Sequence, residues 1–81
     1  MNIDYAPRAL HALDSIPSTI KKTFYKQVRL LSANLRHPSL RAKKFDETKD
    51  WWQARVNDDW RFYFKIVDDT YVIQDVIKHP K

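Results

Sequence analysis

Two arginines flank a short turn-forming segment in the second half of the chain. Arg55 lies in the run Trp51–Val56, Arg61 lies in the run Trp60–Val67, and residues 57–59 between the runs read Asn-Asp-Asp. Because the connection is short, the two guanidinium groups are expected on neighbouring strands, where like charges repel unless an anion lies between them. The guanidinium fork matches the geometry of a phosphate. This pair therefore predicts a site for the backbone of RNA.

Other polar side chains are expected on the same face of the predicted sheet. Gln53 and Tyr63 each lie two residues from one of the arginines, and successive side chains of a strand point to opposite faces. In the preceding basic segment, either Lys43 or Lys44 must point the same way. Aromatic rings stack on the bases of single-stranded RNA, and amide groups bind them through hydrogen bonds. The same pattern is also that of a solvated basic sheet face whose charges discourage aggregation.

One histidine is placed where it could move a proton. His79 follows the last apolar run, and histidine is the side chain that gains or loses a proton near neutral pH. The simpler interpretation is an exposed histidine near the chain end. The three histidines lack the spacing of zinc ligands, and the aspartates of the turns lack the spacing of a calcium loop. With no cysteine and no glycine, the sequence excludes thiol catalysis, disulfides and a Gly-rich phosphate loop.

The composition defines the class of protein. The 81 residues include 15 Lys plus Arg against 10 Asp plus Glu, a net charge of +5, and a small basic protein favours polyanionic partners. Apolar residues make up 43% and charged residues 31%, which predicts one globular domain over residues 1–81. Apolar runs are far shorter than the about 20 residues of a membrane-spanning helix. With no secretory leader pattern either, we expect a cytoplasmic protein without membrane contact.

Two helices and a sheet are expected to position these residues. The spacing of apolar residues predicts one helix from Pro7 to about Ile16 and a second from about Pro17 to Leu35 or Arg36. Period-two alternation predicts four strands, over residues 41–46, 51–56, 60–67 and 71–78. Residues 1–6 are a further short strand or arm. The order predicts an α+β fold, with an N-terminal helical hairpin packed on a small, mainly antiparallel sheet.

The tryptophans indicate which face of that sheet is buried. Trp60 alternates with Phe62 and Phe64, which predicts that all three belong to the core. Trp51 and Trp52 are adjacent, so one is expected to point inward and the other outward. An outward tryptophan is a candidate anchor for a partner protein, because tryptophan is enriched at the energetic centres of interfaces.

Four stretches of the sequence resemble the RelE/ParE toxin superfamily, the small basic toxins of bacterial toxin–antitoxin pairs. They are Leu40–Phe45, Trp52–Val56, Asp59–Tyr63 and Asp75–His79. The resemblance covers nearly the whole chain, and its most specific part is the arginine-bearing pair of strands. It implies the two-layer RelE/ParE-like fold and an acidic cognate antitoxin as partner.

The resemblance also implies an activity. RelE-like members are mRNA interferases, which cut messenger RNA in the ribosomal A site without a metal or other cofactor. The ribose 2′-OH attacks the adjacent phosphate and leaves a cyclic phosphate. On this basis the candidate catalytic residues are Arg61, Arg55 and His79, the last being similar in placement to the C-terminal histidine of HigB-type toxins. The candidate contacts to RNA or phosphate are Lys43, Lys44, Gln53, Tyr63 and Lys81.

The chain departs from RelE at its C-terminal end. RelE carries an arginine just after the last strand and a tyrosine beyond it, whereas these positions fall at Pro80 and Lys81 here. The HigB-like set is therefore the closer match. Two alternatives stay open: a ParE-like inhibitor of DNA gyrase that acts by protein contact, and a decayed toxin that retains only antitoxin binding.

Overall fold

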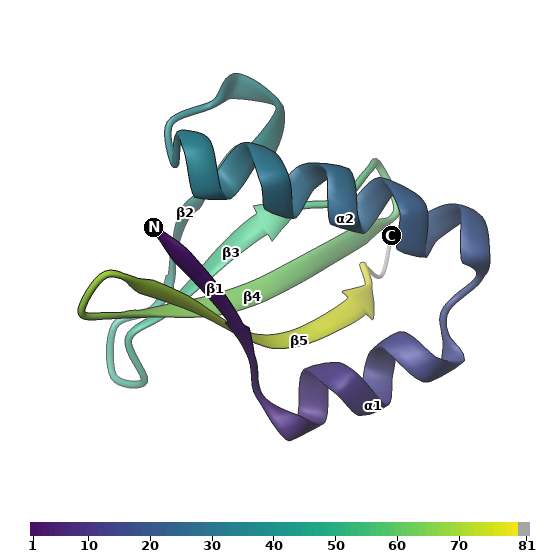
Figure 1. The fold of residues 1–81 in the computed structure, drawn as a ribbon, viewed down its shortest axis with the longest axis horizontal. Helices are drawn as coiled ribbons and strands as arrows, with labels where there is room; N and C mark the ends of the chain where they lie inside the picture. Colours follow the sequence, from purple (N-terminus) through teal and green to yellow (C-terminus); the bar gives the residue numbers. More distant parts are fainter. Residues whose placement is uncertain (80–81) are drawn as a thin grey trace.

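Residues 1–79 are described by a computed structural model, which shows two helices on a five-stranded sheet (Figure 1). The helices are α1 (Pro7–Ser15) and α2 (Ser18–Ala33), and a single 3-10 turn, η1 (Pro38–Leu40), follows them. The strands are β1 (Asn2–Tyr5), β2 (Lys43–Asp46), β3 (Trp51–Arg55), β4 (Trp60–Val67) and β5 (Thr70–Lys78).

The sheet has the strand order β1-β5-β4-β3-β2. β1 pairs in parallel with β5, and the three other pairs are antiparallel. β5 therefore lies inside the sheet, between β1 and β4, which accounts for its nearly continuous apolar sequence. The predicted α+β fold is confirmed: the helices form one layer and a mainly antiparallel sheet forms the other.

The helices run in opposite directions across one face of the sheet (Figure 1). Pro7 occupies the first turn of α1, where its missing N–H costs no hydrogen bond. α2 ends at Ala33, earlier than the predicted Leu35 or Arg36, because Asn34 is extended. The Asn34 side chain then accepts a hydrogen bond from the Arg36 N–H at 3.0 Å, which turns the chain away from the helix axis.

The core lies between the helices and the sheet. Phe24 of α2 meets Phe62 of β4 edge-on, with ring centroids 5.4 Å apart, and both rings are fully buried. Trp52 stacks on Phe64 at 6.1 Å on this face. Trp51 instead lies beside Tyr63 on the opposite face, so the prediction of one inward and one outward tryptophan is confirmed.

The chain turns without glycine. Asp50 and Asp68 take the left-handed conformation, with φ of 58° and 54°, at positions that glycine commonly fills. Arg41 also takes the left-handed conformation, with φ of 46°. Because of this kink β2 begins only at Lys43, and the predicted strand start at residue 41 is wrong. The turn between β3 and β4 is closed differently, by the Asn57 side chain, whose Oδ1 accepts hydrogen bonds from two N–H groups of the turn.

Candidate functional site

The sheet face opposite the helices bears a basic pocket. It has a volume of about 200 Å³ and is lined by Arg41, Lys43, Gln53, Arg55 and Arg61. Two pairs of directly opposite residues in the sheet form most of this pocket. Lys43 of β2 pairs with Gln53 of β3, and Arg55 of β3 pairs with Arg61 of β4. The prediction that the two arginines lie on neighbouring strands is thus confirmed. Four cations around one amide make this hollow a candidate site for an anion.

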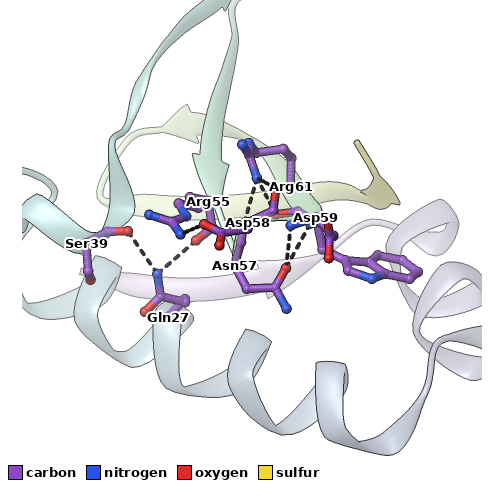
Figure 2. A network of polar contacts seen from close by, with 8 residues as sticks. Gln27, Ser39, Arg55, Asn57, Asp58, Asp59 and Arg61 are labelled. Carbon is purple, nitrogen blue, oxygen red and sulfur yellow. Dashed lines mark hydrogen bonds and ion pairs between the residues drawn. The ribbon is translucent and has the colours of Figure 1, made fainter. Parts of the chain in front are cut away.

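The two arginines are held by the β3–β4 turn (Figure 2). Arg55 forms an ion pair with Asp58. Arg61 donates from one guanidinium nitrogen to the main-chain carbonyls of Asn57 at 2.6 Å and Trp60 at 3.0 Å. The Asp58 side chain is 87% exposed, and an ion pair at such a site contributes only about 0–1 kcal/mol. Arg55 can therefore exchange this exposed partner for another anion that binds in the pocket.

A buried glutamine of α2 supports the pocket from within the fold. Gln27 is only 5% exposed, and its amide nitrogen donates to the main-chain carbonyls of Arg55 at 2.8 Å and Ser39 at 3.2 Å (Figure 2). It thereby joins α2 to β3 and to the segment that precedes Arg41. Sequence analysis missed Gln27, although its position three residues after Phe24 lies on the apolar stripe of α2.

Replacing Gln27 by alanine should lower the free energy of unfolding by about 1–3 kcal/mol, because the main-chain carbonyls of Arg55 and Ser39 lose the buried amide that donates to them. Urea denaturation of the purified chain measures the change. Lys26→Ala is the matched control, since Lys26 is exposed on the same helix and its loss should cost less than about 0.5 kcal/mol. Equal midpoints for the two variants would contradict the role given to Gln27.

The choice between Lys43 and Lys44 is decided by the strand register. Lys43 pairs with Gln53 and lines the pocket. Lys44 pairs with Trp52 and points to the other face, where its ammonium lies 5.2 Å from the Trp52 ring centroid. There it also binds Asp50, and this hydrogen bond raises the pKa of Lys44. The expectation that one of the two lysines shares the face of Gln53 is therefore met by Lys43, because neighbouring residues of a strand face opposite ways, and an RNA contact by Lys44 stays a prediction.

Two further predicted residues do not line the pocket, and a third lies outside the described residues. Tyr63 shares the face of Arg61 but lies beneath Phe45 and Trp51 and is only 6% exposed. This burial raises the pKa of the Tyr63 phenol, and the charge of Arg61 lowers that pKa to a lesser extent. His79 is exposed just beyond β5, and its main-chain N–H donates to the Asp59 carbonyl at 2.6 Å. Lys81 lies outside the described residues.

Arg41 is the pocket residue that sequence analysis missed as a site residue. It lies outside the strands, in the left-handed kink between η1 and β2. Its closeness to Arg55 arises because α2, η1 and β3 meet at Gln27. The only signal in the sequence is the density of cations at positions 41, 43 and 44.

Two other kinds of feature are absent from the described part of the chain. Residues 1–79 contain no group of three or more His, Asp or Glu side chains arranged to hold a metal ion. No helix within this range is both long and apolar enough to cross a membrane.

Sequence comparison identifies the family. A family model described as "ParE toxin of type II toxin-antitoxin system, parDE" matches residues 3–80. The chain belongs to this toxin family. No curated protein sequence matches this ParE-family toxin significantly.

Solved structures of similar fold include a toxin and complexes of toxins with antitoxins. The YoeB/ParE toxin from Agrobacterium tumefaciens has a TM-score of 0.82 and 8% identity, over 99% of this chain and 100% of that chain. The archaeal RelE–RelB complex from Pyrococcus horikoshii OT3 has a TM-score of 0.77 and 18% identity, over 95% and 92%. The YoeB–YefM complex from Staphylococcus aureus has a TM-score of 0.78 and 16% identity, over 99% and 98%. The predicted membership of the RelE/ParE superfamily is confirmed.

Proposed function

We propose that this ParE-family toxin is an endoribonuclease that cuts messenger RNA on the ribosome and thereby inhibits translation. The observation that carries the proposal is the basic pocket, in which Arg41, Lys43, Arg55 and Arg61 surround Gln53. Clustered cations repel one another in the free protein, and a phosphodiester relieves that repulsion. Arginine is the side chain best matched to the two free oxygens of such a group.

The pocket suits a reaction in which negative charge grows on a phosphate. In the proposed step the ribose 2′-OH loses its proton and attacks the adjacent phosphorus. The bond to the 5′ oxygen of the next nucleotide breaks, this oxygen takes the electron pair and a proton to leave as a 5′-hydroxyl, and a 2′,3′-cyclic phosphate remains. Arg61 is preorganised, because the turn carbonyls already hold one side of its guanidinium. Arg55 exchanges Asp58 for the phosphate. Donors fixed before the reaction stabilise the developing charge most effectively.

The side chains that line the pocket are arginine, lysine and glutamine, and none of these ordinarily changes protonation near neutral pH. The proposed proton acceptor for the 2′-OH is His79, two residues beyond Ile77, the direct partner of Arg61. An exposed histidine at this end of β5 is able to approach a phosphate bound at Arg61. As the RelE resemblance implies, the proposed reaction uses no metal or other cofactor.

We also propose a cognate acidic antitoxin as the protein partner. The similar structures include RelE bound to RelB and YoeB bound to YefM. The net charge of +5 on this chain would accelerate encounter with an acidic partner. Binding of the antitoxin would restrain the toxin in the cytoplasm until the antitoxin is removed.

A second function, inhibition of DNA gyrase by protein contact, is favoured by two observations. The matching family model is that of the ParE toxin, and inhibition of DNA gyrase is the activity that a resemblance to ParE implies. In addition, the pocket contains no side chain that ordinarily titrates near neutrality. A gyrase inhibitor would need the basic face for binding only.

Induced expression in bacteria separates these functions. We expect growth arrest within minutes and new 5′ ends of cellular RNA inside translated codons, mapped by sequencing. Arg61→Ala and His79→Gln should each reduce the cuts, whereas the matched control Lys65→Ala should not, since Lys65 shares the face of Arg61 but lies outside the pocket.

Three results would contradict the proposal. Growth arrest with intact messenger RNA and a DNA-damage response would assign the chain to gyrase inhibition. Normal growth, with binding of the antitoxin retained, would assign it to a decayed toxin. Cuts of equal frequency in wild type and Arg61→Ala would remove the basic pocket from the reaction.

A further inference from the structure

An aromatic ledge, formed by Phe45 and Trp51, lies beside the basic pocket on the open face of the sheet. The two rings cover Tyr63, with centroid distances of 4.9 Å from Phe45 and 6.0 Å from Trp51. Tyr63 is thereby buried, whereas Phe45 stays 54% exposed. The exposed ring therefore offers a flat apolar surface to a ligand.

The ledge is continuous with the pocket. Phe45 follows Lys43 by two residues on β2, and Trp51 precedes Gln53 by two residues on β3, while Lys43 and Gln53 pair directly. Two residues of a strand span about 7 Å, so the ledge lies about one nucleotide away from the pocket. Lys49, whose ammonium is 5.7 Å from the Trp51 ring centroid, adds a cation at the far edge.

This order of surfaces matches the order of groups in single-stranded RNA. A phosphate in the pocket leaves the neighbouring base within reach of the ledge, and every base has a flat face that stacks on aromatic side chains. The cations of Lys43 and Lys49 flank the rings, and they complement the negative charge of the RNA backbone that carries the base.

We propose that Phe45 and Trp51 form a stacking site for a nucleobase of single-stranded RNA, adjacent to the nucleotide whose phosphate occupies the basic pocket. The proposal rests on the proposed function, because it extends the same RNA site. The bulge of β2 between Lys44 and Asp46 assists, since it leaves Phe45 without a direct strand partner and lets its ring reach over to β4. The ledge recognises the presence of a base rather than its identity.

Binding of two short RNAs to the full-length chain tests the stacking site. Both are fluorescently labelled 2′-O-methyl hexanucleotides, which lack the attacking 2′-OH, and one of them carries abasic sites. Phe45→Leu and Trp51→Leu keep an apolar cover over Tyr63 but remove one aromatic face each. At one fixed salt concentration, each variant should bind the intact RNA roughly 5- to 150-fold more weakly than wild type does. Binding of the abasic RNA should not change.

Lys43→Ala is the matched control, because it removes a cation of the pocket and should weaken the binding of both RNAs to the same extent. Circular dichroism confirms that the leucine variants remain folded. Equal affinity of wild type for the two RNAs, including no detectable binding of either, would overturn the stacking site, as would unchanged affinities of the leucine variants. Mapping of cellular RNA cuts distinguishes failure of the proposed function from failure of the stacking site. Base-dependent binding without cuts would contradict the proposed cleavage of messenger RNA and would support the stacking site.

Discussion

Replacing Arg61 by alanine should lower the rate of messenger RNA cleavage by roughly 10²–10³-fold, the usual loss when one preorganised donor to a developing oxyanion is removed. The turn carbonyls of Asn57 and Trp60 hold the Arg61 guanidinium in place before a phosphate binds. The rate at which cut fragments appear on ribosome-bound messenger RNA measures the effect. Arg61→Lys should recover only part of the loss, because lysine keeps the charge but lacks the planar fork.

The matched control is Lys65→Ala, which removes a cation from the same strand and face but outside the pocket. Its rate should stay within about twofold of wild type, because Lys65 lies about 13 Å along β4 from Arg61 and charges are screened over about 10 Å at 0.1 M salt. Arg61 also supports the turn, so thermal melting of Arg61→Ala must show a folded protein. A folded Arg61→Ala variant with the cleavage rate of wild type would exclude Arg61 from the reaction.

Replacing Phe62 by alanine should lower the free energy of unfolding by about 3–5 kcal/mol. Phe62 is fully buried at the centre of the sheet, where it packs edge-on against Phe24 and beside Phe64. An 81-residue domain is expected to have only about 4–12 kcal/mol of stability. The variant should therefore lose a large part of that stability, and its melting temperature should fall by roughly 10–40 °C.

Phe45→Ala provides the matched control, since it makes the same chemical change at a side chain that is 54% exposed. We expect it to cost well under half as much as Phe62→Ala, because far less apolar area leaves water when Phe45 folds. Urea and thermal denaturation, followed by circular dichroism, measure both variants. Equal losses would show that the core does not depend on the Phe24–Phe62 contact.

The periodic elements could be predicted because each is specified locally. The run Trp60–Val67 alternates without interruption, and the structure forms β4 over these same residues. The end of α2 was less predictable, since apolar spacing continued to Leu35 while the side chain of Asn34 competed for the main chain. Periodicity reports which face is buried, but it does not report where a local polar contact ends an element.

The candidate site was predictable only where two residues share one short turn. Arg55 and Arg61 could be placed together because the connection of residues 57–59 leaves few alternatives. Lys44 and Tyr63 were also assigned to the site, and the structure places Lys44 on the other face and Tyr63 under the aromatic ledge. Their positions depend on strand register and on packing by residues of other strands.

The sequence by itself determined the type and order of the elements, the basic character of the sheet face and the adjacency of Arg55 and Arg61. These properties follow from spacing along the chain and from charge. Only the tertiary structure decided that Arg41 joins the pocket, that Gln27 supports it and that Phe45 and Trp51 extend it. Those contacts join segments far apart in the sequence, and they depend on a left-handed kink, a bulge and a buried amide that local patterns do not specify.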